Sequence, residues 1–591
     1  MHGLLRLLPY YRRHRAELWA GLALLLLARL FEAVIPQLLR IGIDGIAAGS
    51  VALGRLAIGI VVCVALEFAA IWLGRRVVRK LGVEVSYDLR NRLYDHLQKQ
   101  GPAFFARHRT GDLMARAIND IGLIRRVVAL GTRTAVVLVF SSAVAFSFMA
   151  WQSPGLTLLL LVPMPLVFGA AYLLSRRLYQ ESLAVQEGFA GLSDRVQENV
   201  GGIRTIQALN QEGAEIQRFD GANRSYTEQN FRLLRTNSLL SSLMPAFGAL
   251  AVLVVLGFGG KQVLAGDITL GTFTSFLWYL NMVLWPVREA GNMINLFQRG
   301  AAGCDRVFEL LDSEPEIADR PRARAPAAVR GALELHDVGY SYPSGARALD
   351  GVSLRVEAGE TLAVLGRVGS GKTTLLHLLV RLLDPPPGSV LLDGIDVREL
   401  GLATLRRHIA LVPQEPFLFS ESVRENLSYD DPARALAALE AAAHAADFAD
   451  TLARFPLGWE TAVGERGVLL SGGQKQRLTL ARALVRDAPV LLLDDPFSSV
   501  DAETEERILE RLIALRDGHT TVIVTHRVSA ARTAHRVLVL ERGRAVEDGS
   551  PGELRAQRGA YAEIERAQRR SEALRQDLAR EETRAGGGDA A

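Results

Sequence analysis

Cysteine and net charge are both scarce in this sequence of 591 residues. The two cysteines, Cys63 and Cys304, lie far apart in the chain and in different surroundings. Neither a disulfide framework nor a cysteine zinc site can be built from them, so we expect two inert buried thiols. The formal net charge is only +4. That excess is too small to indicate binding to nucleic acid, and we expect no nucleic acid among the partners.

Apolar residues, in contrast, are abundant. They make up 49% of the chain, against 22% charged residues, and the mean hydropathy is +0.16. This composition excludes a wholly disordered chain and indicates contact with lipid. A membrane-spanning helix needs about 20 mostly apolar residues. Six segments meet that requirement: 17–43, 54–74, 127–151, 155–175, 238–262 and 269–295. The first is too long for a secretory signal peptide and no small-residue cleavage site follows it.

Basic residues fix the expected orientation of these spans. They precede the first and third spans and follow the second and fourth, as Arg12, Arg13, Arg15, Arg125, Arg126, Arg75, Arg76, Arg79, Lys80, Arg176 and Arg177. The turn WQSPG at 151–155 has none. Because cytoplasmic loops carry the excess of Lys and Arg, both termini of this multi-pass protein are predicted to be cytoplasmic. Usage rich in Ala, Arg and Leu suggests a bacterial gene, and hence the bacterial inner membrane.

The sequence predicts a helical membrane domain fused to an α/β domain. Residues 1–312 form the membrane domain, whose cytoplasmic segments 76–126 and 176–237 are expected to continue the spanning helices well past the bilayer. Residues 313–330 are rich in Pro, Ala and charge, which is typical of a linker. In residues 331–570, β-rich runs alternate with helical stretches, which predicts a largely parallel sheet. The charged tail, 571–591, is expected to be disordered.

A phosphate-binding loop follows one of these predicted strands. Residues 366–373 fit the pattern G-x-x-x-x-G-K-[ST], between the strand TLAVL and the helix TTLLHLLVRLL. Its glycines allow backbone N–H groups to surround phosphates, and the helix N-terminus favours negative charge. Lys372 is expected to reach the β- and γ-phosphates, and the Thr373 hydroxyl to bind Mg²⁺.

Two further motifs belong with this loop. VLLLD at 490–494 is a buried strand that ends in a carboxylate, and Asp494 is expected to hold Mg²⁺. Leu470-Ser471-Gly472-Gly473-Gln474 precedes the helix KQRLTLARALV. Its backbone donors and the Ser471 hydroxyl form a candidate second phosphate surface at a helix start.

With these motifs in this order, the sequence resembles an ATP-binding cassette (ABC) exporter half-transporter of the type IV fold, over residues 10–570. The resemblance implies ATP and Mg²⁺ as cofactors and assigns roles to matching residues. These are Tyr342 for stacking on adenine; Gly366, Gly369, Ser370, Gly371, Lys372, Thr373 and Thr374 for the phosphates; Ser471, Gly472, Gly473 and Gln474 as the signature; Thr373, Gln414 and Asp494 for Mg²⁺; Asp495, His526 and Gln414 for catalysis; and 499–501 as the D-loop.

The first half of the chain matches the same family. Residues 103–121 and 201–219 resemble its two cytoplasmic coupling loops, Glu465 lies in a segment that touches them, and 304–312 resembles the lead-out to the linker. The resemblance implies a dimer of two half-transporters, with each ATP between one chain's phosphate loop and the other's signature. Closure on ATP can drive transport only if ATP binds the closed state better than the open one.

One position departs from the family pattern. The residue after Asp494 is usually Glu, which polarises the attacking water, and here it is Asp495. Aspartate is shorter by one bond of about 1.5 Å, and a misplacement of about 1 Å can cost ~10²-fold in rate. Slow hydrolysis beside an intact signature resembles the degenerate-site subunit of heterodimeric multidrug-type exporters, whose partner carries the Glu. The alternative is a homodimeric lipid or multidrug transporter in which Asp495 is a competent base.

Ionisable residues inside the predicted spans bear on the cargo. They are Arg29, Glu32, Glu67, Arg133, Arg288 and Glu289. Such residues usually face a bundle interior or a cavity. Ion pairs between helices, Arg29 with Glu32 and Arg288 with Glu289, are one interpretation. A mixed aromatic, polar and charged cavity for a small amphipathic substrate is the other, with the last span contributing Asn281, Asn292 and Asn295 beside Trp278, Tyr279 and Trp285. A soluble ABC ATPase that acts on DNA or ribosomes is excluded by the six spans, and an ATP-gated channel remains compatible with Asp495.

Overall fold

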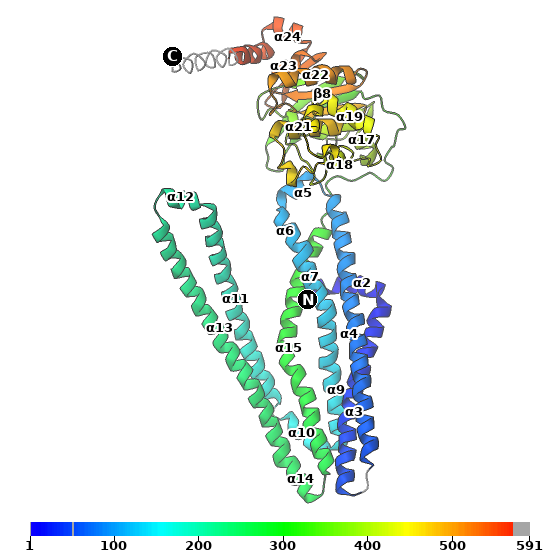
Figure 1. Ribbon diagram of the computed structural model, residues 1–591, viewed down its shortest axis with the longest axis vertical. Coiled ribbons are helices and arrows are strands. Elements are labelled where there is room, and N and C mark those ends of the chain that lie inside the picture. Colours follow the sequence, from blue (N-terminus) through cyan, green and yellow to red (C-terminus); the bar gives the residue numbers. More distant parts are fainter. Residues whose placement is uncertain (1, 50–51, 163, 571–591) are drawn as a thin grey trace. The chain divides into compact units, whose positions relative to one another are not determined.

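The computed structural model describes residues 2–49, 52–162 and 164–570, without the side chains of residues 2, 164–168, 171, 244, 247–248 and 284–292. The expected disorder of 571–591 concerns residues outside this part. The chain forms two compact units (Figure 1). The first contains residues up to Gln98 together with Arg109–Ser313, and the second contains Lys99–His108 together with the chain from Glu314 onward.

The first unit is entirely helical over its described residues. Its helices are α1 (His2–Leu5), α2 (Leu8–Arg13), α3 (Arg15–Ala47), α4 (Leu53–Gln98), α6 (Thr110–Ala115), α7 (Ile121–Arg126), α8 (Thr132–Val136), α9 (Ser142–Gln152), α10 (Pro154–Leu161), α11 (Met164–Gly201), α12 (Ile203–Ala208), α13 (Glu212–Val254), α14 (Gly260–Ala265) and α15 (Leu270–Leu311). Short π-helical segments at Arg116–Asp120, Val127–Gly131 and Val137–Ser141 join α6 to α9 in one helix, Thr110–Gln152, and Val255–Gly259 joins α13 to α14.

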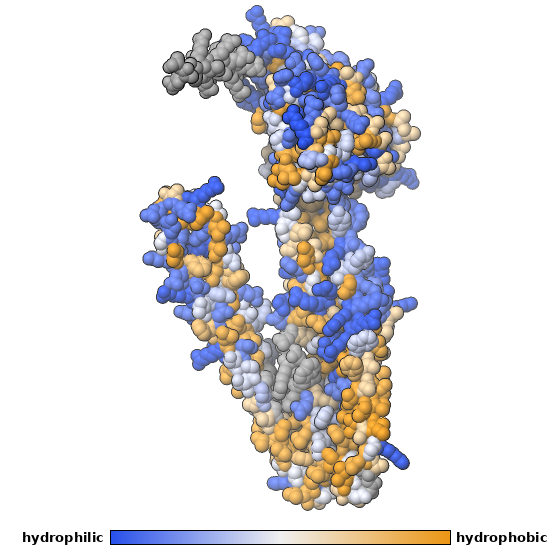
Figure 2. Space-filling view, in the orientation of Figure 1, coloured by the Kyte–Doolittle hydropathy of each residue, from blue (hydrophilic) through white to orange (hydrophobic). Residues whose placement is uncertain are grey.

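The long helices have a membrane part and a polar part, as the sequence predicts. Arg15–Ala47, Leu53–Gln98 and Thr110–Gln152 are long and apolar enough to cross a bilayer. Figure 2 shows apolar surface gathered at one end of this unit. With 46 residues, α4 is roughly 69 Å long, more than twice the ~30 Å hydrocarbon core. Its second half therefore continues beyond the bilayer.

Small residues let α3 and α4 approach closely. A Cβ added to Gly21 on α3 would lie 2.7 Å from Val78 Cγ2 on α4, and one added to Gly74 would lie 3.2 Å from Leu25 Cγ. Because lipid is as apolar as the side chains, spanning helices associate through such close packing. The two helices are therefore a fixed antiparallel pair.

Helices α11 and α13 form a second antiparallel pair, joined at its tip by α12 (Figure 1). Phe189 and Tyr226 meet between them, with ring centroids 6.1 Å apart. No residue of α12 is buried, and the neighbouring Leu209 is 64% exposed. The tip of the pair thus leaves apolar surface uncovered.

The second unit is built on two sheets. Its strands are β1 (Leu333–Ser341), β2 (Arg347–Val356), β3 (Thr361–Leu365), β4 (Val390–Leu392), β5 (Ile395–Asp396), β6 (Ile409–Val412), β7 (Val490–Asp494), β8 (Thr520–Thr525), β9 (Arg536–Glu541) and β10 (Arg544–Gly549). The order β2-β1-β4-β5 is antiparallel, whereas β10-β9-β3-β8-β7-β6 is parallel except for the edge strand β10. The parallel sheet is thus confirmed, and the antiparallel one is additional.

The helices of the second unit are α5 (Pro102–Arg107), α16 (Lys372–Leu379), α17 (Leu402–His408), α18 (Val423–Leu427), α19 (Leu436–Ala445), α20 (Ala449–Ala453), α21 (Gly472–Leu484), α22 (Ala502–Leu515), α23 (Val528–Arg532) and α24 (Pro551–Gln557), with 3₁₀ turns at Gly458–Glu460 and Glu465–Gly467. Helices α16, α17, α21, α23 and α24 contact strands of the parallel sheet. Every residue of β3, β7 and β8 is buried. Burial on both faces explains their continuous apolar sequences.

The predicted linker is held against the second unit. Arg324 exchanges backbone hydrogen bonds with Glu399 and Gly401, at 2.7 and 3.0 Å. On the other side, Arg107 of α5 donates to Glu316 at 2.7 Å. The segment 103–121, which resembles the first coupling loop, is therefore bonded to the linker through Arg107 and Glu316.

Candidate functional site

The predicted site residues gather at one edge of the parallel sheet. Strands β3, β8, β7 and β6 lie side by side, and the last residues of neighbouring strands are within one position of each other. The chain leaves this edge at Gly366, His526, Asp495 and, two residues after β6, Gln414. The carboxyl edge of a parallel sheet is where ligands bind in open α/β folds. Motifs separated by up to 160 residues in sequence are thus brought together (526 − 366).

The phosphate loop is shaped by its glycines. Gly371 has φ +100°, in the left-handed region, and a Cβ there would clash with the Ala348 carbonyl oxygen. Lys372 Nζ donates to the carbonyl oxygens of Gly366 and Arg367, both at 2.8 Å. Burial lowers the pKa of Lys372, since the loop removes its ammonium from water. The loop and Lys372 together form a positively charged, concave surface at the start of α16.

Two predicted Mg²⁺ ligands are already adjacent. Asp494 ends β7 and is only 3% exposed, and the Thr373 hydroxyl faces it. Burial raises the pKa of Asp494, and the polar Thr373 hydroxyl and the charge of nearby His377 oppose that rise. A hydroxyl and a carboxylate are the oxygen donors that Mg²⁺ prefers. The residues present therefore fit the ion.

Asp495 and His526 form an ion pair across the ends of β7 and β8. His526 Nδ1 lies 3.0 Å from Asp495 Oδ1. Asp495 has φ +48°, and its backbone N–H donates to Val524 O at 2.9 Å. Its side chain is 12% exposed, whereas that of His526 is 52% exposed. The carboxylate is thus turned toward the histidine and held there.

Tyr342 and Gln414 lie at the rim of the site. The Tyr342 hydroxyl is 3.0 Å from Thr374 Oγ1, and its ring meets Tyr340 edge to face at 5.3 Å. Tyr342 therefore stands over the first turn of α16. Gln414 is exposed just after β6, in the strand that pairs with β7.

The signature segment begins α21. Ser471 caps this helix, because its hydroxyl accepts from Gln474 N at 3.3 Å and the Gln474 side chain accepts from Ser471 N at 2.9 Å. Ser471 and Gly472 are exposed. Gly473 is packed: a Cβ there would lie 2.8 Å from Ser499 O in the D-loop. One exposed helix N-terminus is thus fixed to the D-loop.

Sequence reasoning missed two residues that support the site. Gln476 accepts from Ser499 N at 2.9 Å and donates to Ser498 Oγ at 2.5 Å, which joins α21 to the D-loop. His377, on α16, faces Asp494. Each lies within a helix that continues a recognised motif. His377 follows Thr373 by four residues and Gln476 follows Gly473 by three, the spacing that places residues on one helix face, and this is the signal that could have found them.

The ionisable residues of the predicted spans form other pairs than the two expected between helices. Arg29 pairs with Glu32 on the same helix, α3, so that this pair is not between helices. One contact between helices joins Arg29 Nη2 to Glu67 Oε1 on α4, at 3.8 Å. Tyr279, an expected wall of a cargo cavity, is fully buried and donates to Ala33 O at 2.7 Å. The side chains of Arg288 and Glu289 lie outside the described part.

Comparisons with known proteins agree with this architecture. Residues 18–287 match the family described as the ABC transporter transmembrane region, and residues 349–498 match the ABC transporter family. The ATP-dependent lipid A-core flippase of Syntrophus aciditrophicus is 34% identical over 510 residues, which cover 85% of this chain and 84% of the relative. The multidrug resistance-like ATP-binding protein MdlA of Escherichia coli is 34% identical over 574 residues, 96% of each chain.

A solved structure is similar over nearly the whole chain. A bacterial Atm1-family ABC exporter with ATP bound superposes with a TM-score of 0.77 at 27% identity, covering 94% of this chain and 98% of the other. Both family matches, the relatives and the structure point the same way. The chain belongs to the ABC transporter family, as an ATP-driven exporter half-transporter with one transmembrane and one ATP-binding domain.

Proposed function

We propose that this chain is one subunit of a heterodimeric exporter that moves hydrophobic or amphipathic, drug- or lipid-like compounds out of the cytoplasm or inner leaflet of a bacterial inner membrane. Its partner is a second half-transporter with Glu at the catalytic position, and its own site hydrolyses ATP slowly. The observation that carries the proposal is Asp495, one bond shorter than Glu and paired with His526 at 3.0 Å.

The roles of the site residues follow from their places. The phosphate loop and Lys372 bind the phosphates of ATP, and Thr373, Gln414 and Asp494 hold Mg²⁺. Mg²⁺, when bound, neutralises charge that develops on the transferred phosphoryl group. Tyr342 stands where an aromatic ring can cover the adenine.

The catalytic pair is Asp495 with His526. Asp495 directly follows the Mg²⁺ ligand Asp494, at the position where the family usually has Glu, so it is the group to orient the attacking water. Its Oδ1 is engaged by His526, which leaves Oδ2 for that water. A side chain shorter by about 1.5 Å places this oxygen short of the position that Glu would reach, which supports a slow reaction.

Two surfaces support a dimer. The start of α21 carries an intact LSGGQ with Ser471 and Gly472 exposed, ready to complete the nucleotide site of another chain. The tip of the α11–α13 pair leaves Ile203 and Leu209 uncovered, at 44% and 64% exposure. Exposed apolar side chains at the cytoplasmic end of a long helix pair favour docking on a nucleotide-binding domain.

The cargo class rests on the relatives and on one surface of α4. The names of the two relatives refer to lipid A-core and to multidrug resistance. Phe68, Trp72 and the arginines at 75, 76 and 79 line a shallow groove, and the Arg76 guanidinium lies 5.7 Å from the Trp72 ring centroid. Apolar surface next to fixed positive charge suits amphiphiles with an acidic head group.

The decisive experiment measures ATP turnover of the purified chain alone in lipid, beside Asp495→Glu. We expect the wild type to be nearly inactive and the Glu variant to recover on the order of 10²-fold. Asp495→Asn is the matched control, since it keeps the length of the side chain and removes its charge.

Brisk turnover by the wild type, with little gain from Glu, would contradict the heterodimer. The homodimeric alternative, in which Asp495 is a competent base, would then hold. Co-expression with a Glu-bearing half-transporter encoded nearby extends the test: a heterodimer should hydrolyse ATP where this chain alone does not.

A further inference from the structure

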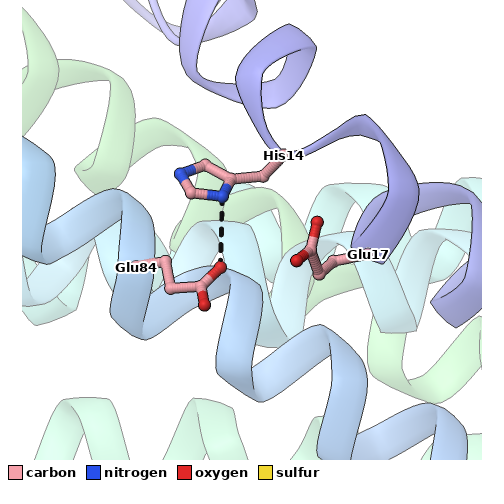
Figure 3. A group of neighbouring side chains, drawn as sticks. All are labelled: His14, Glu17 and Glu84. Carbon is pink, nitrogen blue, oxygen red and sulfur yellow. Dashed lines mark ion pairs between the residues drawn. The ribbon is translucent and has the colours of Figure 1, made fainter.

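A cluster of metal-binding side chains lies in the first unit, where no nucleotide motif occurs. His14 is at the junction of α2 and α3, Glu17 is in the first turn of α3, and Glu84 is on α4 (Figure 3). One ligand atom of each lies within 4.8 Å of the other two. The close α3–α4 packing brings these residues, 70 positions apart in sequence (84 − 14), into one place.

The histidine sits between two carboxylates. His14 Nδ1 is 3.1 Å from Glu84 Oε2, and His14 Nε2 is 3.2 Å from Asp88 Oδ2. A neutral imidazole has only one N–H. When Asp88 accepts it, the lone pair of Nδ1 faces the Glu84 oxygen. Glu84 Oε2 is buried, and no described residue donates a hydrogen bond to it. The lone pair of Nδ1 and the negative charge of Oε2 repel each other, and a cation between the two atoms removes this repulsion.

The spacing between His14 and Glu84 suits a metal ion. Two ligand atoms that are 3.1 Å apart and each ~2.1 Å from an ion subtend about 95° at it, which is an ordinary angle between neighbouring ligands. Asp88 would then hold the far nitrogen of the histidine, as carboxylates do behind metal-binding histidines. One imidazole and two carboxylates suit Zn²⁺ and similar divalent transition metals.

Two basic side chains compete for the same carboxylates. Lys80 Nζ lies 3.3 Å from Glu84 Oε1 and 3.8 Å from Glu17 Oε1. Arg13 lies 3.3 Å from Asp88. Lys80 is 61% exposed, so it can turn into water, and its contact with Glu84 is to Oε1, which leaves Oε2 for an ion.

We propose that His14, Glu17 and Glu84 form a binding site for a divalent transition metal of the Zn²⁺ class, which fastens the α2–α3 junction to the cytoplasmic half of α4. Asp88 acts as a positioning residue for His14. The site is separate from the nucleotide site, and the proposal does not depend on the identity of the cargo or on the dimer partner.

The test uses the full chain, purified without a histidine tag, freed of metal by chelation and kept free of nucleotide. Zn²⁺ binding is measured by calorimetry, and Co²⁺ binding by its visible absorption, which reports the ligand set. We expect one site that raises the melting temperature of the wild type. Glu17→Gln should weaken Zn²⁺ at least about 10-fold while the metal-free protein melts as the wild type does, because the Glu17–Lys80 pair is long.

Three further variants make the result specific. His14→Asn should abolish the Co²⁺ absorption, and Lys80→Ala should tighten Zn²⁺ binding because a competing cation is removed. His336→Asn is the matched control. It removes another histidine–carboxylate pair, His336 Nε2 to Glu334 Oε2 at 3.2 Å, and should change nothing.

Equal Zn²⁺ affinity in the wild type, Glu17→Gln and His14→Asn would overturn the proposal. So would a second result: a melting temperature of the wild type to which neither Zn²⁺ nor Co²⁺ adds anything. The contacts of His14 with Glu84 and Asp88 would then hold the two helices together without a metal.

Discussion

At the scale of single residues, the two aspartates at the end of β7 are held differently. Asp494 is 3% exposed and faces Thr373, and burial raises its pKa. Asp495 turns through a left-handed backbone toward His526. Burial of the Asp494 charge destabilises the fold, and a bound cation would offset that loss. The Asp495 side chain is 12% exposed, which leaves it accessible to water.

The burial of Asp494 predicts a stability gain in Asp494→Asn. A carboxyl whose folded-state pKa is raised favours the protonated form, so its charge destabilises the fold above that pKa and the penalty disappears as the pH falls through it. Without nucleotide, Asp494→Asn should therefore melt higher than the wild type at pH 8. About 1 kcal/mol corresponds to ~2–4 °C for a domain of this size.

Calorimetric melting of both proteins at several pH values checks this. The difference between them should shrink as the pH is lowered, because the wild-type carboxyl becomes neutral. A difference that is constant with pH would mean that shape, and not charge, separates the two side chains. The slow residual ATP turnover of the wild type should be lost in the variant at every pH.

At the scale of elements, the signature helix and the D-loop act as one piece. Gly473 packs on Ser499 O, and Gln476 bonds to both Ser498 and Ser499. A shift of α21 therefore moves the D-loop, and with it the start of α22 at Asp501, which caps that helix.

Gly473→Ala should disturb this junction. Its Cβ would lie 2.8 Å from a backbone oxygen, which cannot turn away as a side chain can. We expect a loss of about 1–3 kcal/mol in the free energy of unfolding of the nucleotide-binding unit, measured by denaturant titration. Gly472→Ala is the control, since its Cβ would meet Ser499 at an ordinary 3.5 Å. Equal stability of the two variants would contradict the proposed packing.

Elements also show what the sequence could predict. The phosphate loop, the Asp494 strand and His526 are local patterns, and parallel strands must bring their carboxyl ends to one edge. The Asp495–His526 contact and the His14–Glu84 contact depend on the register between strands β7 and β8 and between helices α3 and α4. Register is set by packing, such as Gly21 against Val78, and no local pattern reveals it.

At the scale of the whole molecule, the predicted orientation places the α11–α13 tip in the cytoplasm and the α14–α15 turn outside. Single cysteines can test it in a Cys63→Ala background. Cys304 can stay, because it is fully buried and burial raises its pKa to about 12, so that it remains an unreactive thiol.

We expect Asp267→Cys, between α14 and α15, to react with a membrane-impermeant maleimide in intact spheroplasts. Gln211→Cys, between α12 and α13, should react only after permeabilisation. Both positions are exposed, so access to the reagent and not burial decides the outcome. The reverse pattern would mean that the basic loops face outward and that the assignment of the termini is wrong.

The length of α13 lets a small tilt of the helix produce a large displacement of its tip. Its 43 residues make a rod of roughly 65 Å, and the stretch from its start to Pro245 contains no other proline. If the rod turns about the neighbourhood of Pro245, where proline weakens the helix, the arm from Glu212 to Pro245 is about 50 Å long, and a tilt of about 10° moves its far end by ~9 Å. A small angular change near the membrane thus produces a displacement at the tip that is nearly as wide as a helix. A substitution near Pro245, where the helix would bend, should therefore change the size of this displacement more than a substitution at the tip.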